Sequence, residues 1–187
     1  MNPWVQTFSG KKFDLINPSI DSVCLIDIAH ALSRICRFNG HVKNFYSVAE
    51  HSVYVSNCVP EKYAKEALLH DAHEAYVGDV TSPMKRAMAR NAVKRGSPVS
   101  DFATTEAGVY NAVVRRFGLY SNTDEHCEDR IKHADLALLA TEQERFFPEM
   151  VSDWMLKIPP VNIKILGLSP VRARKMFLDR AKKLGIK

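Results

Sequence analysis

The sequence lacks the long apolar runs that membrane segments need. The chain has 187 residues, and none of its apolar stretches approaches the length of about 18 residues that a transmembrane helix needs. We therefore expect no membrane span. The first residues, MNPWVQTFSGKKFDL, also lack the apolar core of a signal peptide. Both absences favour an intracellular protein whose side chains fold around an ordinary core.

Cysteine is scarce and widely spaced. The four cysteines form no CxxC pair, which excludes the usual zinc ribbon and gives no sign of a disulfide framework: Cys24, Cys36, Cys58 and Cys127. Reduced thiols are therefore expected.

Several catalytic and nucleotide-binding motifs are also missing. The chain has no glycine-rich phosphate loop of the Walker or Rossmann type, and it has no GxSxG elbow. These absences argue against an ATP-driven motor, a kinase, a dehydrogenase and a serine hydrolase.

Acidic residues are outnumbered by basic ones. The chain has 26 Lys and Arg against 21 Asp and Glu, a formal charge of +5, which mildly favours polyanionic ligands. The basic residues are spread along the chain with small clusters, among them Lys85-Arg86 and Arg115-Arg116. A solvated surface explains this pattern more simply than a nucleic-acid face, and no nucleic-acid motif accompanies it. We expect no stable nucleic-acid complex.

Helix start and stop signals dominate what is present. The first 20 residues, with Gly10 and Pro18, predict a short hairpin or an extended arm. The rest predicts an all-α, compact multi-helix fold in a single domain, residues 1–187. The first helices are expected from an Asp27 cap to about Cys36, from the Ser47–Glu50 capping box to about Asn57, and over about 61–77 between Pro60 and Gly78.

Proline and glycine also delimit the later helices. Ser82-Pro83 predicts a cap and a first-turn proline for a helix at MKRAMAR, and VKRGSPVS reads as the following loop. Further helices are expected over about 101–117 ending at Gly118, from Thr123 or Asp124 to about Phe147 before Pro148, and from Ser169-Pro170 to before Gly185.

The stretch ALLHDAHEAYVGDV, residues 67–80, combines a core-like apolar pattern with many titratable groups. On a helix, His70 and Glu74 share a face and Asp71 lies about 100° round from His70. An imidazole nitrogen beside a carboxylate oxygen suits a divalent ion such as Zn, Mn, Fe or Co. A metal site needs further ligands from elsewhere in the chain.

Two more titratable residues stand in apolar helical surroundings. His51 occurs in SVAEHSVYV and Asp135 interrupts IKHADLALLATE. A buried carboxylate without a partner costs several kcal/mol, so Asp135 needs a cation or firm hydrogen bonds. Each residue alone is more often an ordinary hydrogen-bonded side chain. Together with His70 and Asp71 they predict a metal site that leaves positions for water and substrate.

The chain resembles the HD-domain metal-dependent phosphohydrolases. The segments TFSGKKFDLINP, DIAHALSRICRFNGH, YSVAEHS, ALLHDAHEAYVGDVTSPMK and HADLALLATE carry this resemblance over nearly the whole length. HDAxEAYxGD followed by Ser-Pro and Lys is similar to the small nucleotide-hydrolysing branch, typified by bacterial 5′-deoxynucleotidases and phage dATP triphosphohydrolases.

The resemblance implies roles for individual residues. It assigns the metal to His51, His70, Asp71 and Asp135, and the catalytic carboxylates to Glu74 and Asp79. It places Lys85 near phosphate and Arg37 upstream as a second phosphate contact, with Arg34 as the alternative alignment, and His41 beside substrate. The implied cofactor is a divalent transition metal (Zn, Co, Mn or Fe), with a possible second ion such as Mg at Asp79.

The resemblance leaves two reactions open. One converts a dNTP to a deoxynucleoside and triphosphate, and surplus basic residues near the site favour it; the other removes the phosphate of a dNMP. A non-catalytic HD-fold nucleotide sensor is a lower alternative, although every expected catalytic position is filled. The resemblance also implies a homo-oligomer in the cytoplasm, either of a bacterium or of the host cell if the protein is phage-encoded.

Overall fold

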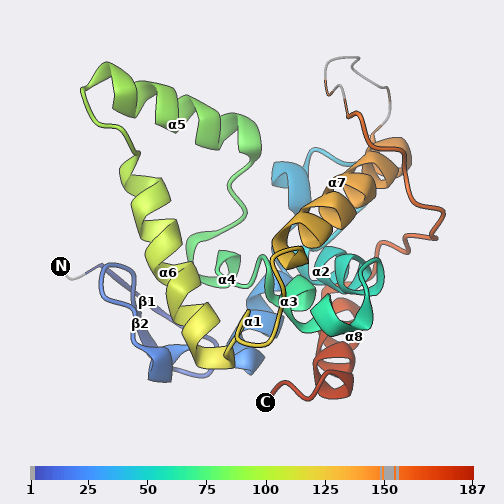
Figure 1. Ribbon diagram of the computed structural model, residues 1–187, viewed down its shortest axis with the longest axis horizontal. Coiled ribbons are helices and arrows are strands. Elements are labelled where there is room, and N and C mark those ends of the chain that lie inside the picture. Colours follow the sequence, from blue (N-terminus) through green and yellow to red (C-terminus); the bar gives the residue numbers. More distant parts are fainter. Residues whose placement is uncertain (1–2, 148, 150–153, 155) are drawn as a thin grey trace.

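Helices form most of the chain, and a two-stranded hairpin precedes them (Figure 1). The computed structural model describes residues 3–147, 149, 154 and 156–187. Strands β1 (Trp4–Gln6) and β2 (Lys12–Asp14) pair antiparallel, with Val5 opposite Phe13. Phe13 is fully buried and stacks on Tyr76, 3.8 Å between ring centroids. The predicted all-α fold with an N-terminal hairpin is therefore confirmed.

Eight α-helices follow the hairpin within the described residues. They are α1 (Leu25–Leu32), α2 (Val48–Asn57), α3 (Ala64–Leu69), α4 (Glu74–Val77), α5 (Ser82–Lys94), α6 (Asp101–Phe117), α7 (Cys127–Phe146) and α8 (Pro170–Lys183). None of these helices combines the length and the apolarity that crossing a membrane requires.

Helix α2 runs through the centre of the fold. Every residue from Val48 to Ser56 is buried, and the helix packs against α3, α7 and α8. Its side chains contribute to two apolar clusters, one with α1, α6 and α8 and the other with α3 and α7. A helix buried on all sides holds its polar residues in fixed positions, because packed side chains leave little room for movement.

Local capping signals predicted several helix ends correctly. The Ser47 hydroxyl accepts from the Glu50 N–H at the start of α2, and the Ser100 hydroxyl accepts from the Ala103 N–H at the start of α6. Gly118 ends α6 with φ +58°, in the left-handed region that favours glycine. Helix α8 begins at Pro170 as expected. Helix α5 begins one residue early, with Thr81 rather than Ser82 at the cap position.

Two carboxylates predicted at cap positions lie elsewhere, and both make long-range contacts. Asp27 lies inside α1 and accepts from the N–H and the hydroxyl of Ser9, at 2.6 and 2.8 Å, which ties the N-terminal hairpin turn to the helix. Asp124 precedes α7 by three residues; it accepts locally from the His126 N–H at 3.1 Å, and over a longer range from Lys62 Nζ at 2.7 Å and from the Tyr63 hydroxyl. The predicted stop at Pro148 lies outside the described residues.

The single helix predicted over 61–77 is broken in the structure. A 3₁₀ turn (Glu61–Tyr63) precedes α3, α3 ends at Leu69, and α4 begins only at Glu74. Between them the Ala72 N–H donates to Leu69 O and the Glu74 N–H donates to Asp71 O, which is the tighter i to i+3 pattern. His70 and Asp71 therefore lie in turns rather than on a continuous helical face.

Only one of the two hydrogen bonds of the predicted capping box forms, the one from the Glu50 N–H to the Ser47 hydroxyl. The buried carboxylate of Glu50 does not bind the Ser47 N–H. It accepts instead from the backbone N–H groups of Leu166, Gly167 and Leu168, at 3.2, 3.0 and 2.6 Å. The Tyr54 hydroxyl also donates to it. This carboxylate therefore fastens the chain before α8 to the central helix.

Glu50→Gln should lower the free energy of unfolding by about 3 kcal/mol, because an amide nitrogen would face backbone donors and the charge-assisted hydrogen bonds would be lost. Urea unfolding followed by circular dichroism measures the change. The control is Glu128→Gln, at an exposed position of α7, which should change stability little. Equal midpoints for the two variants would contradict the role given to Glu50.

Candidate metal centre

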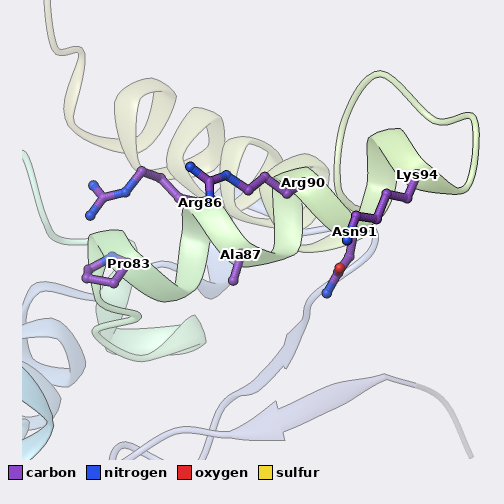
Figure 2. A pocket seen from close by; sticks show the side chains of 6 residues that line it. All are labelled: Pro83, Arg86, Ala87, Arg90, Asn91 and Lys94. Atoms are coloured by element: carbon purple, nitrogen blue, oxygen red, sulfur yellow. The ribbon is translucent and has the colours of Figure 1, made fainter.

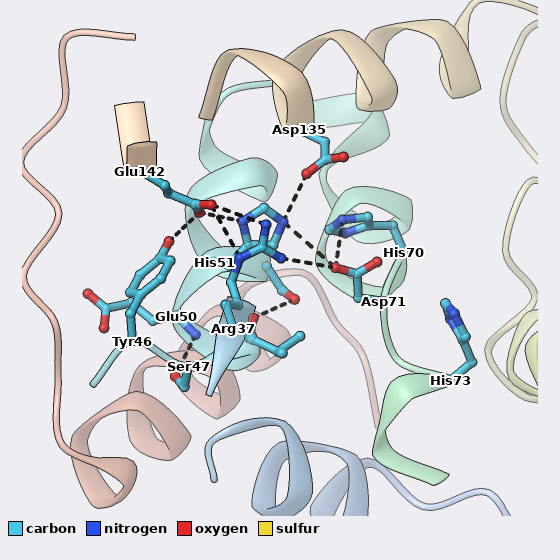
Figure 3. Close-up of polar contacts among 12 residues, drawn as sticks. Arg37, Tyr46, Ser47, Glu50, His51, His70, Asp71, His73, Asp135 and Glu142 are labelled. Atoms are coloured by element: carbon cyan, nitrogen blue, oxygen red, sulfur yellow. Dashed lines mark hydrogen bonds and ion pairs between the residues drawn. The ribbon is translucent and has the colours of Figure 1, made fainter. Parts of the chain in front are cut away.

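Four predicted ligands from three parts of the chain meet at one point (Figure 3). His51 lies in the middle of α2, His70 and Asp71 lie in the turns after α3, and Asp135 lies on α7. His51 Nε2 is 3.1 Å from Asp135 Oδ1 and 3.7 Å from Asp71 Oδ2, and His70 Nε2 is 3.2 Å from Asp71 Oδ2. The donor atoms of His51, His70 and Asp135 lie within 4.8 Å of one another.

The two imidazoles present their Nε2 atoms to this point. His70 Nδ1 lies 2.8 Å from Ala67 O, which can only accept, so Nδ1 carries the proton. His51 Nδ1 lies 2.7 Å from Glu142 Oε1 in the same way. Both Nε2 atoms are buried, and neither makes a hydrogen bond within the described part of the chain. Buried nitrogens of this kind fit a metal ion, because an unsatisfied polar atom is otherwise costly.

The donor set fits a divalent ion of intermediate softness. Two neutral imidazole nitrogens and two carboxylate oxygens suit Zn, Co, Mn or Fe, whereas no cysteine takes part. Without an ion, the carboxylates around His51 favour its protonated form. Burial lowers the pKa of His51, but the carboxylates of Glu142 and Asp135 outweigh it and raise this pKa to about 9. A cation is therefore favoured at the centre.

Glu142 is a residue that the sequence motifs did not single out. It is fully buried and lies on α7, seven residues after Asp135. Because seven residues make about two helical turns, both carboxylates are on one face of the helix. Besides His51 it binds the Tyr46 hydroxyl at 2.8 Å and Arg37 Nε at 3.2 Å. The i, i+7 spacing of two acids in an apolar helix was the available signal. A carboxylate behind a metal-binding histidine fixes its tautomer and its direction.

Arg37 lies beside the centre, and its contacts are with acidic side chains. Its Nη2 is 3.1 Å from Glu142 Oε2 and its Nη1 is 3.9 Å from Asp71 Oδ2. The alternative, Arg34, donates to His30 O and Ser33 Oγ instead, so Arg37 is the arginine near the ligands. Its predicted contact with phosphate stays a prediction.

His41 was predicted to contact substrate. It follows the 3₁₀ turn Arg37–Gly40 and is exposed. No side-chain hydrogen bond or ion pair joins it to the ligands among the described residues, so its role also stays a prediction.

The two predicted catalytic carboxylates lie close to the ligands. Glu74 begins α4, is buried, and its Oε2 has no hydrogen-bond partner among the described residues. Burial raises the pKa of Glu74 to about 10, and the negative charges of Asp71 and Asp79 act in the same direction. Burial and Asp71 also raise the pKa of Asp79, although Arg37 opposes this. Glu74 is therefore protonated at neutral pH in the metal-free protein.

Lys85, the predicted phosphate contact, extends from the first turn of α5. Its Nζ lies 2.7 Å from Glu106 Oε1, on α6, and His73 Nε2 lies 3.3 Å from the same oxygen. Glu106 was not identified from the sequence. The side chain of His73 lies apart from the ligand cluster (Figure 3). Burial lowers the pKa of Lys85, but the hydrogen bond and the negative charge of Glu106 outweigh it and raise this pKa. Glu106 thus fixes the direction of the Lys85 side chain.

Glu142→Gln should weaken metal binding about 10- to 100-fold, because the amide cannot supply the charge that orients and polarises His51. Competition of cobalt or zinc between the protein and a chelator measures the affinity. Glu144→Gln, an exposed change on the same helix, is the matched control and should bind metal like the unmodified chain. Equal affinities for both variants would contradict this role of Glu142.

Comparison with known proteins gives two full-length relatives. No family model matches the chain. It is 36% identical to the uncharacterized protein YfdR of Escherichia coli over 95% of this chain and 93% of the relative. It is 33% identical to an uncharacterized protein of Rhodobacter capsulatus, again over 95% and 93% of the two chains. The chain belongs to the same family as these two bacterial proteins.

Proposed function

We propose that the protein is a divalent-metal-dependent phosphohydrolase of the HD-domain type that acts on deoxynucleotides. The observation that carries this proposal is the convergence of His51, His70, Asp71 and Asp135 on one point, where neither buried Nε2 atom makes a hydrogen bond within the described residues. Glu74 lies buried beside this point, and its pKa is raised in the metal-free protein, which suits a proton donor. A metal site that only stabilises the fold does not require a buried carboxyl group beside the ligands.

A bound divalent ion would supply a Lewis acid and a water molecule of lowered pKa. The residues of the chain then divide the remaining work. Lys85 neutralises charge on the phosphate oxygens, and the amide groups at the start of α5 add donors nearby. Arg37 holds Glu142 and Asp71 in place and balances their charge.

The proposed reaction on a dNTP is hydrolysis at the α-phosphorus. The oxygen of water forms a bond to this phosphorus, and the bond from phosphorus to the 5′ oxygen breaks. Glu74 donates its proton to the 5′ oxygen as it leaves, and the proton that the attacking water gives up restores Glu74. The products are a deoxynucleoside and triphosphate. Asp79 orients Glu74 or binds a second ion such as Mg.

We favour a dATP-type triphosphohydrolase over a 5′-deoxynucleotidase. Support comes from the resemblance to the phage enzymes and from Lys85 in the first turn of α5, whose charge suits a polyanionic substrate. The resemblance likewise supports a homo-oligomer in the cytoplasm.

The test is incubation of the purified protein with dATP or dAMP and Mn, Co or Zn, followed by identification of the phosphate product. We expect triphosphate and deoxyadenosine from dATP, and no turnover when a chelator is present. Orthophosphate from dAMP with dATP unchanged would establish the monophosphate reaction instead. Tight nucleotide binding without turnover under any of these metals would favour the sensor.

Glu74→Gln should lower kcat about 10²- to 10⁴-fold, the usual contribution of a general acid, because the amide cannot transfer the proton. Metal content should stay that of the unmodified protein, since Glu74 is not one of the ligands. Steady-state kinetics and metal analysis of the same sample separate the two effects. A variant that keeps its kcat would remove Glu74 from the mechanism.

The same variant also reports the pKa of Glu74. The ordinary value of 4.5 lies below the folded value of about 10, so the unfolded chain loses this proton first as pH rises. Stability of the metal-free protein therefore falls between these pH values, and glutamine removes that loss. We expect the stability advantage of Glu74→Gln to grow from about pH 6 to about pH 9, as measured by urea unfolding in chelator. A constant difference would contradict the raised pKa.

A further inference from the structure

The positive charge of the chain is concentrated in one segment. Residues 80–100 contain five basic residues and no acidic one, and the rest of the chain has 21 residues of each sign. The formal charge of +5 therefore belongs to this segment alone. The basic residues are Lys85, Arg86, Arg90, Lys94 and Arg95.

Three of these residues form a stripe on the outer face of α5. Arg86, Arg90 and Lys94 follow one another at intervals of four, so they share a face of the helix. Ala92, the one buried residue that α5 contributes, lies about 200° round from Arg90. The stripe therefore points away from the contact with α6.

The stripe is free of acidic partners within the described chain. Lys85 turns inward to Glu106, whereas no ion pair of the described residues involves Arg86, Arg90 or Lys94. Together with Pro83, Ala87 and Asn91 these side chains line an open groove of about 340 Å³ (Figure 2). Three unneutralised cations side by side repel one another, and a polyanion would relieve this repulsion.

The shape of α5 fits an extended ligand rather than a single nucleotide. The stripe from Arg86 to Lys94 covers eight residue steps, about 12 Å along the axis. Ten of the 13 residues of α5 are exposed, and the helix lies at the edge of the fold with α6 beneath it (Figure 1). A helix with such free flanks can enter the major groove of duplex DNA, about 12 Å wide.

We propose that α5 binds duplex DNA through its phosphates, with Arg86, Arg90 and Lys94 as the contacts. The proposal departs from the expectation that no stable nucleic-acid complex forms, because that expectation treated the basic residues as dispersed. It does not rest on the phosphohydrolase proposal. Phosphate contacts carry no sequence information, so the binding should be largely sequence-independent.

The test is fluorescence anisotropy of a labelled duplex of about 20 base pairs, titrated with protein in chelator so that no metal-dependent reaction takes place. Three phosphate contacts predict a slope of about −2.7 in log K against log salt. Arg86→Gln, Arg90→Gln and Lys94→Gln together should weaken binding at least about tenfold at low salt and bring the slope close to zero.

The matched control removes the same charge from another helix. Arg172→Gln, Lys182→Gln and Lys183→Gln change three residues of α8, and this variant should bind DNA within about twofold of the unmodified protein. Circular dichroism checks that both variants fold. Equal losses in the two variants, no duplex binding at low salt, or tighter binding of the matching single strand would each overturn the proposal.

Discussion

The buried carboxylate of Glu142 is the contact on which the centre depends. It accepts from the Tyr46 hydroxyl, pairs with Arg37, and holds the Nδ1 side of His51, and the side chains of Glu142 and His51 are fully buried. A buried ion pair of this kind adds little net stability, since desolvation offsets much of the attraction. What it supplies is direction: it leaves His51 Nε2 facing the other ligands.

The central helix α2 joins this network to the rest of the fold. Its neighbouring residues Glu50 and His51 are both fully buried, and their side chains serve different ends. Glu50 binds the backbone before α8, whereas His51 faces α7 and the turn after α3. Because α2 is fixed by packing and by Glu50, His51 cannot retreat when carboxylates and another imidazole approach it.

Charge is distributed in two distinct regions. The inner region gathers His51, His70 and several carboxylates around one point, where burial raises the pKa of Glu74 and Asp79. The outer region is the basic face of α5. Lys85 connects them, since it sits on α5 and pairs with Glu106 beside the inner region. The same helix thus offers a cation to the centre and three others to solvent.

Local sequence signals determined much of the fold and indicated the first set of candidate ligands. Caps such as Ser47 and stops such as Gly118 act within a few residues, so the sequence displays both partners. The candidate ligands His51 and Asp135 could be recognised in the sequence because a titratable residue in an apolar helix conflicts with its surroundings. Lys85, too, follows a recognisable Ser-Pro turn.

Tertiary structure alone decided which partner each polar group meets. Glu142 is separated from His51 by 91 residues and from Arg37 by 105, and no local pattern encodes such pairs. The same holds for Asp27, a plausible cap that binds Ser9 instead. Short-range signals fix where a helix begins, but a buried charge takes the partner that packing brings to it, and packing is a property of the whole chain.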